Sequence, residues 1–258
     1  MQTLDESILA VMDCGDKDIL PFLPCILQDF WSIGTDPEVV IGLIKKHIKN
    51  TSRRTVLDLG CGKGAVSVKI AKALQYNCHG IDGIADFVSF AAAKADEYGV
   101  AGLCKFEQGD IREKIENTGK YDIIVLGAIG QVLGNYFQTL TLLALHLTRT
   151  GIIIIDDGYV ADNSSFVHPH VLKRSEMLKQ IAQAGMMLVD EVPAAETTTE
   201  VYEQEYSWLA RRCDELAVKH PEKRALFEDY KKQQQMEYEN LKSEISCATL
   251  VVRKKDRF

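Results

Sequence analysis

The chain has 258 residues, of which 46% are hydrophobic and 26% are charged, and its formal net charge is −7. This composition is that of a folded globular protein and excludes a disordered chain, while the acidic balance argues against a partner bound through a phosphate backbone. Seven cysteines, at positions 14, 25, 61, 78, 104, 213 and 247, form no CxxC pair, so neither a disulfide framework nor a metal site is predicted.

The first 50 residues are predicted to be a helical cap. The segment MQTLDESILAV has no basic residues ahead of its apolar ones, so no signal peptide is expected. No apolar run approaches the ~20 residues that cross a bilayer. We therefore expect a cytoplasmic protein without a membrane partner. Asp36 and Pro37 predict a helix start, and VVIGLIKKHIK follows with apolar residues at helical spacing.

From residue 55 the chain alternates between strands and helices. Strands are predicted at 55–59, 78–82, 103–107, 121–126 and 151–157, and helices near 64–74, 85–98, 135–148 and 171–184. Runs such as IIVL and IIII are continuously apolar, as expected when helices cover both faces of a parallel sheet. The alternation predicts an α/β fold with an open, mostly parallel sheet.

The pattern changes after the strand-like MMLVDEV. Two long helices are predicted within 195–244, the first opened by Thr197-x-x-Glu200, which resembles a capping box, and the second by Pro221. A strand at 246–254 closes the chain. We therefore expect three parts: the cap at 1–50, a central domain at 51–194 and 245–258, and a helical insertion at 195–244 that forms a substrate lid.

The side chains of the first inserted helix allow two interpretations. A stripe of Leu209, Cys213 and Leu216 at helical spacing indicates packing against the partner helix. The same helix carries residues that would suit a pocket for an acceptor with an anionic group, namely Tyr202, Tyr206, Trp208, Arg211 and Arg212.

The main motif is D58-L-G60-C-G62-K-G64, where a strand gives way to a helix. Glycines let the backbone turn tightly and approach a ligand, and the amides at the helix start favour a negative group. Asp58 can orient a cationic amine. Gly60, Gly62 and Ala65 also satisfy the dinucleotide pattern GxGxxG/A, and Asp82 lies about 20 residues on. By itself the loop therefore leaves NAD open as the ligand.

Residues 54–194 and 246–254 resemble the class I S-adenosylmethionine-dependent methyltransferases. Asp58 stands two residues before the first glycine of the loop, Asp82 ends the second strand, and Asp110 follows the third. A strand closes the chain, as in that family. The resemblance implies a seven-stranded sheet whose last strand is antiparallel, S-adenosyl-L-methionine as the cofactor, and an enzyme.

The resemblance also implies a role for each segment. The glycine loop would line the methionine moiety, Asp82 would accept both ribose hydroxyls, and Asp110 would accept from the adenine amino group. Trp31 could fold over the cofactor or belong to the core. The expected cofactor-binding residues are Asp58, Gly60, Cys61, Gly62, Gly64, Asp82, Gly83, Asp110, Ile111, Leu126, Gly127 and Trp31.

The methyl acceptor would bind beyond the carboxyl ends of the strands. The long polar loop after the strand at 151–157 supplies three candidate catalytic residues, Asp157, Tyr159 and His168. For the histidine, an ordinary loop residue is the stronger interpretation. After the fourth strand, GAIGQVLGNYF lacks the Asn/Asp-Pro-Pro-Tyr sequence of many amino-methylating enzymes, and Gln131 is its main polar contact.

We expect transfer of a methyl group to a small molecule, with no nucleic acid as partner and a monomer or homodimer as the state. A methyltransferase acting on RNA or protein comes next. Two further alternatives stay open. An NAD(P)-binding oxidoreductase would need a Tyr-x-x-x-Lys pair, and residues 159–163 do not provide one. A non-catalytic protein that binds S-adenosylmethionine would keep the loop without the reaction.

Overall fold

The computed structural model describes residues 2–49, 53–195 and 198–255. Its centre is a seven-stranded sheet in the order β3-β2-β1-β4-β5-β7-β6. The last strand along the chain, β7, pairs antiparallel with both β5 and β6, and the other pairings are parallel. The predicted fold is confirmed. The strands are β1 (Thr55–Leu59), β2 (Asn77–Asp82), β3 (Cys104–Gln108), β4 (Tyr121–Gly127), β5 (Leu147–Tyr159), β6 (Met186–Pro193) and β7 (Ser246–Lys254).

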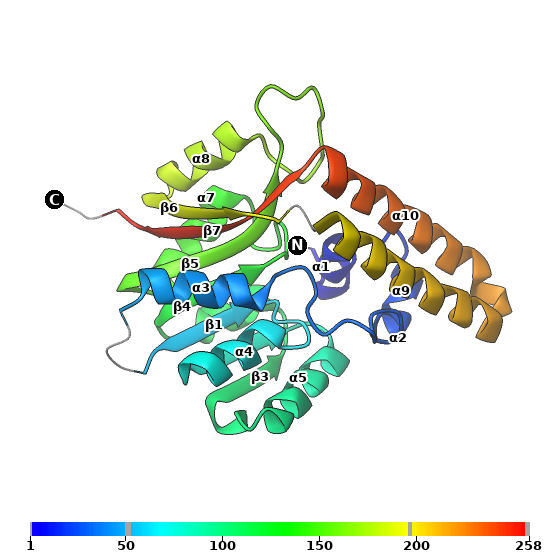
Figure 1. Cartoon of the computed structure of the whole chain (residues 1–258), viewed down its shortest axis with the longest axis horizontal. Helices are drawn as coiled ribbons and strands as arrows, with labels where there is room; N and C mark the ends of the chain where they lie inside the picture. The colour runs from blue at the N-terminus through cyan, green and yellow to red at the C-terminus, as the bar shows by residue number, and fades with distance from the viewer. Residues whose placement is uncertain (1, 50–52, 196–197, 256–258) are drawn as a thin grey trace.

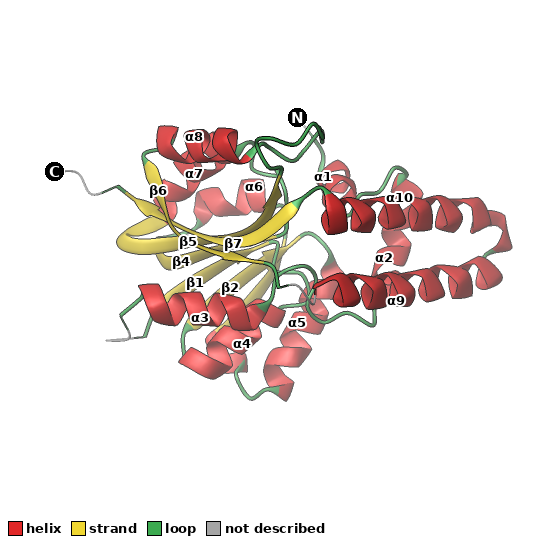
Figure 2. Cartoon of the chain, turned by 45° about the horizontal axis from the view of Figure 1, so that its top comes forward, coloured by secondary structure: helices red, strands yellow, loops and turns green. Residues whose placement is uncertain are grey.

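Helices cover both faces of this sheet, as Figure 2 shows. On one face lie α3 (Pro37–His47), α4 (Ala65–Leu74) and α5 (Ala85–Glu97). On the other lie α6 (Ile111–Lys114), α7 (Tyr136–His146) and α8 (Arg174–Gln183). Successive residues of a strand enter opposite cores: Ile152 and Ile154 face the first layer, and Ile153 and Ile155 face the second. This is why the central strands are apolar throughout.

A third core lies beyond the sheet and joins the two ends of the chain. It unites α1 (Leu4–Val11), the 3₁₀ helix η1 (Lys17–Phe22) and α2 (Leu23–Ile26) with the long pair α9 (Thr198–Lys219) and α10 (Arg224–Ser243). In Figure 1 this pair extends away from the sheet, and α1 lies between the pair and the strand ends. Phe87 of α5 is buried in the same core. The elements α1, η1, α2, α9 and α10 are therefore packed as one unit, which we name the cap.

One boundary differs from that predicted. The strand predicted at 151–157 begins at Leu147, because residues 147–150 pair and extend instead of continuing α7. Thr197, the first residue of the predicted capping box, lies outside the described residues. The stripe of Leu209, Cys213 and Leu216 is buried in the cap, so the packing interpretation is confirmed. Among the described helices, none is long and apolar enough to span a membrane.

Candidate functional site

The glycine loop joins β1 to α4, and neighbouring side chains pack closely against two of its glycines. Gly60 has φ of 72°, and a Cβ there would lie 2.4 Å from Cγ2 of Ile129. Gly64 has φ of 75°, and its Cβ would lie 2.6 Å from that of Ala91. Both positions favour glycine by backbone conformation and exclude a side chain by contact. The Gly60 amide donates to Ile81 O at 2.8 Å, which holds the loop against β2.

A cavity opens where this loop meets the carboxyl ends of β1, β2 and β4. Of the expected cofactor-binding residues, all except Gly64 and Leu126 line it. Gly64 instead precedes α4 behind the loop, and Leu126 is buried in the core on the far side of the sheet. The lining residues that match the expectation are Trp31, Asp58, Gly60, Cys61, Gly62, Asp82, Gly83, Asp110, Ile111 and Gly127.

Asp82, at the end of β2, has an acceptor geometry suited to a diol. One carboxylate oxygen accepts the Gly62 amide at 2.8 Å, and the other accepts the Ile84 amide at 2.9 Å. Each oxygen keeps a lone pair for a further donor. Burial raises the pKa of Asp82, partly offset by these two amides. Donors from a bound ligand would therefore stabilise the ionised form.

Asp58 lies one strand away and is 2% exposed. Its carboxylate accepts the Ser67 hydroxyl of α4 at 2.7 Å. Burial raises the pKa of Asp58 to about 6, and the nearby Asp82 adds to the rise. Among the described residues it has no cationic partner in an ion pair, so an ammonium group in the cavity would complement it.

Asp110 is held differently from the other two carboxylates. It caps α6 by accepting the Arg112 amide at 2.9 Å, and the guanidinium of Arg112 donates to both of its oxygens. This pairing keeps the pKa of Asp110 below its usual value. Ile111, next along the chain, is 7% exposed and lines the cavity with Ile84. A flat apolar group such as adenine would fit between them.

Several lining residues were missed by the sequence reasoning. Helix α1 lies across the cavity and contributes Leu4, Ser7 and Ile8, and a Cβ on Gly83 would lie 3.0 Å from Leu4 Cδ1. Thr35 also lines the cavity, and a Cβ on Gly127 would lie 2.5 Å from its Oγ1. Further apolar lining residues are Val11, Met12, Ile33, Ala128, Ile129 and Val132. The sequence of α1 contains a capping box at Thr3 and Glu6, which predicts the start of a helix but not which surface the helix packs against.

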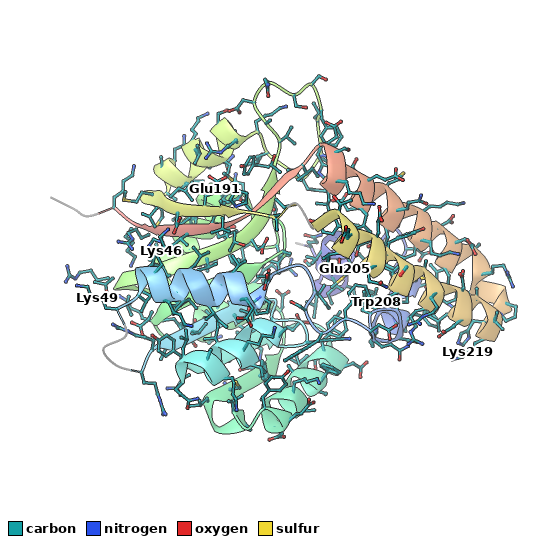
Figure 3. The ribbon with its side chains drawn as sticks, in the orientation of Figure 1. Lys46, Lys49, Glu191, Glu205, Trp208 and Lys219 are labelled. Carbon is teal, nitrogen blue, oxygen red and sulfur yellow. The ribbon has the colours of Figure 1, made fainter. Side chains whose placement is uncertain are left out.

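Asp157, Tyr159 and His168 are not among the described residues that line this cavity. Asp157 accepts the Tyr136 hydroxyl at 2.7 Å. Tyr159 donates to Glu191, labelled in Figure 3 beside β6, at 2.7 Å. Nε2 of His168 lies 3.7 Å from Oε2 of Glu237 in α10. The structure does not bring the three together, and their catalytic role stays a prediction.

The polar residues of α9 and of the loop after β4 also have partners in the fold. Arg211 and Arg212 both pair with Asp29, and Arg212 also pairs with Glu215, so the guanidinium groups expected to bind an acceptor anion already have carboxylate partners. The Tyr202 hydroxyl lies 3.7 Å from Sγ of Cys247. Gln131, in the loop after β4, donates to the His170 carbonyl at 3.0 Å and joins two loops.

The chain matches a family model described as a methyltransferase domain over residues 50–243. A curated relative, the ubiquinone biosynthesis O-methyltransferase of Rickettsia canadensis, is 30% identical over 118 residues, which are 46% of this chain and 48% of that protein. The matched segment spans about half the length of that relative.

Solved structures with the same fold cover almost the whole chain. A methyltransferase from Geobacter sulfurreducens in complex with S-adenosyl-L-homocysteine has a TM-score of 0.73 at 19% identity, covering 91% of this chain and 98% of that one. The [4+2]-cyclase SpnF has a TM-score of 0.70 at 16% identity, covering 99% and 98%. At these identities the likeness shows the fold.

Proposed function

Because the chain belongs to the methyltransferase-domain family, we propose that it transfers a methyl group from S-adenosylmethionine to a small-molecule acceptor. Family membership confirms the resemblance inferred from the motifs. The observation that carries the proposal is the order of groups along one cavity: Asp58, the glycine loop, Asp82 and Asp110 with Ile111. That order matches an amine, a ribose and an adenine in sequence.

The residues present fit this cofactor. Asp82 keeps one lone pair on each oxygen for two ribose hydroxyls, and Asp58 is a buried carboxylate facing a cavity with no cation paired to it. Gly60 and Gly62 have positive φ, of 72° and 52°, which lets the backbone of the loop turn beside the cavity without a side chain. When bound, the cofactor would supply a methyl group activated by a sulfonium.

The part played by this chain is alignment and exclusion of water. Much of the cavity lining is apolar, through Ile33, Ile129 and Val132 together with Met12 of the cap. Such a surface suits the apolar body of an acceptor and removes competing water. Cys61 does not serve as a nucleophile, because burial raises the pKa of its thiol well above the usual value.

The nature of the acceptor follows from charge and lining together. The net charge of −7 disfavours a nucleic acid, and much of the cavity lining is apolar. We propose a small, partly apolar molecule as the acceptor. A cytoplasmic location and a monomeric or homodimeric state stay predictions.

The test is transfer of label from methyl-labelled S-adenosylmethionine to a panel of small metabolites, with the Asp82→Ala variant as control. Label should appear in small organic products with the wild-type chain and fall sharply with the variant. Label appearing only in protein or RNA would contradict the proposed acceptor class. Cofactor binding without any transfer to any of these acceptor classes would instead support a non-catalytic protein.

A further inference from the structure

Lys63, inside the glycine loop, is a buried lysine that lines the cavity and whose ammonium is hydrogen-bonded to the cap. The residue is 4% exposed, and its ammonium donates to the carbonyl oxygens of Leu27 and Phe30, the latter at 2.7 Å. Its own carbonyl accepts the Trp31 indole N–H at 3.2 Å. Both ends of Lys63 are therefore bonded to one short segment, residues 27–31.

The opposite side of this segment is held by the insertion. Asp29 accepts two hydrogen bonds from Arg212 of α9, both at 2.7 Å, and one from Arg211 at 2.9 Å. The hydrogen bonds from Arg212 lower the pKa of Asp29 to about 2. Trp208, labelled on α9 in Figure 3, packs its ring edge-on against Phe30 at 5.6 Å.

A buried lysine at this position destabilises the fold through desolvation of its ammonium, unless that charge makes compensating hydrogen bonds. Burial lowers the pKa of Lys63 to about 8, which shows the desolvation that the ammonium bears. An apolar residue of similar volume would pack among Phe87 and Phe90 without that cost. What only the lysine supplies is a directed link from the loop to two carbonyl groups of the cap.

We propose that Lys63 is a positioning residue that couples occupancy of the cofactor loop to the packing of α9, through residues 27–31 and Asp29. This inference rests on the proposed function, because it takes the loop to hold the adenosyl ligand. A ligand that orders the loop also orders residues 27–31, which are hydrogen-bonded to Lys63, and with them the Asp29–Arg212 ion pair. Coupling of this kind is reciprocal, so contacts that hold α9 in place strengthen cofactor binding.

The test combines calorimetric titration with S-adenosylhomocysteine and amide hydrogen exchange on the full-length chain. In the wild type, the ligand should slow exchange in the loop, in residues 23–31 and in α9. In Lys63→Met the affinity should fall about tenfold, and the slowing in α9 should vanish while that at residues 82–84 remains. The matched control is Lys72→Met, since Lys72 of α4 also donates to a backbone carbonyl, that of Tyr98 at 3.1 Å, yet is exposed.

A second variant tests the link from its far end. Arg212→Gln leaves the loop intact and should also abolish the slowing in α9, whereas Glu215→Gln, which removes the other partner of Arg212, should not. Equal slowing of α9 in wild type and in both coupling variants would overturn the proposal, as would ligand binding by the wild type that leaves α9 unchanged. Absence of any binding by the wild type would contradict the proposed function itself.

Discussion

Asp82 is the residue on which cofactor affinity should depend most. Asp82→Ala removes the acceptors for two hydroxyls and leaves the amides of Gly62 and Ile84 without their partner. We expect S-adenosylhomocysteine binding to weaken by on the order of 1.5–3 kcal/mol, as for the loss of charged hydrogen bonds. Titration calorimetry measures this, with the exposed Asp86→Ala as control. Unchanged affinity would mean that the ribose lies elsewhere.

Asp156 should make stability depend on pH. Burial raises its pKa to about 6 from the ordinary 3.8, so the folded state binds the proton more tightly than the unfolded chain. The resulting stabilisation is present below about pH 4 and is lost as pH rises through 6. Asp156→Asn cannot ionise and still accepts from Thr249.

The Asp156→Asn variant should therefore gain stability relative to the wild type between pH 4 and pH 7.5, by on the order of 1–3 kcal/mol. Urea unfolding of both proteins at the two pH values measures this gain. An identical difference at both pH values would show that Asp156 titrates normally.

For individual residues, the sequence indicates the residue type and its position but not its contact partners. The carboxylates 58, 82 and 110 were found because each follows a predicted strand, and the structure places all three along one cavity. Arg211 and Arg212 were assigned to a substrate because their partner, Asp29, lies more than 180 positions away. The role of Lys63 was missed for the same reason.

Helix α1 forms one wall of the cavity, and its apolar side chains should contribute to affinity. Replacing both Leu4 and Ile8 by serine removes the contacts with Gly83. We expect S-adenosylhomocysteine binding to weaken about tenfold, which corresponds to about 1.4 kcal/mol. The control is Ala10→Ser on the exposed face. Equal affinities by calorimetry would show that α1 is not part of the site.

Secondary structure was largely predictable, because hydrophobic periodicity is a local property. The strands and helices from β1 to β6 begin and end within a few residues of the predicted positions. The exception is the start of β5: residues 147 and 148 were predicted to end a helix, yet they belong to β5, because pairing with Tyr121 begins at Leu147. Long-range pairing decided that boundary, and periodicity does not report it.

For the whole molecule, the topology was predictable by resemblance but the assembly of the cap was not. The N-terminal helices and the insertion were expected as separate caps, whereas α2, α9 and α10 share one core with Phe87 of α5. The hydrophobic periodicity of each segment shows that it has a buried face, but not which distant segment packs against that face. The division into domains at 50, 195 and 244 stays a prediction.

A cofactor that contacts the loop, α1 and the carboxyl ends of β1, β2 and β4 should stabilise the folded chain as a whole. At a ligand concentration of 100 times Kd, binding adds about 2.7 kcal/mol, and for a chain of this size Tm should rise by about 5–10 °C. Differential scanning calorimetry with S-adenosylhomocysteine measures it. A Tm that stays constant as the ligand concentration rises would contradict a site built from all these parts.

The central claim is that this cavity holds an adenosyl-sulfur ligand and not a dinucleotide, and one titration tests it directly. The purified chain is titrated in parallel with S-adenosylmethionine, S-adenosylhomocysteine and NAD. We predict saturable binding of the two adenosyl ligands and none of NAD, because Asp58 and the narrow loop suit an ammonium and not a second phosphate. Binding of NAD without either adenosyl ligand would contradict the account.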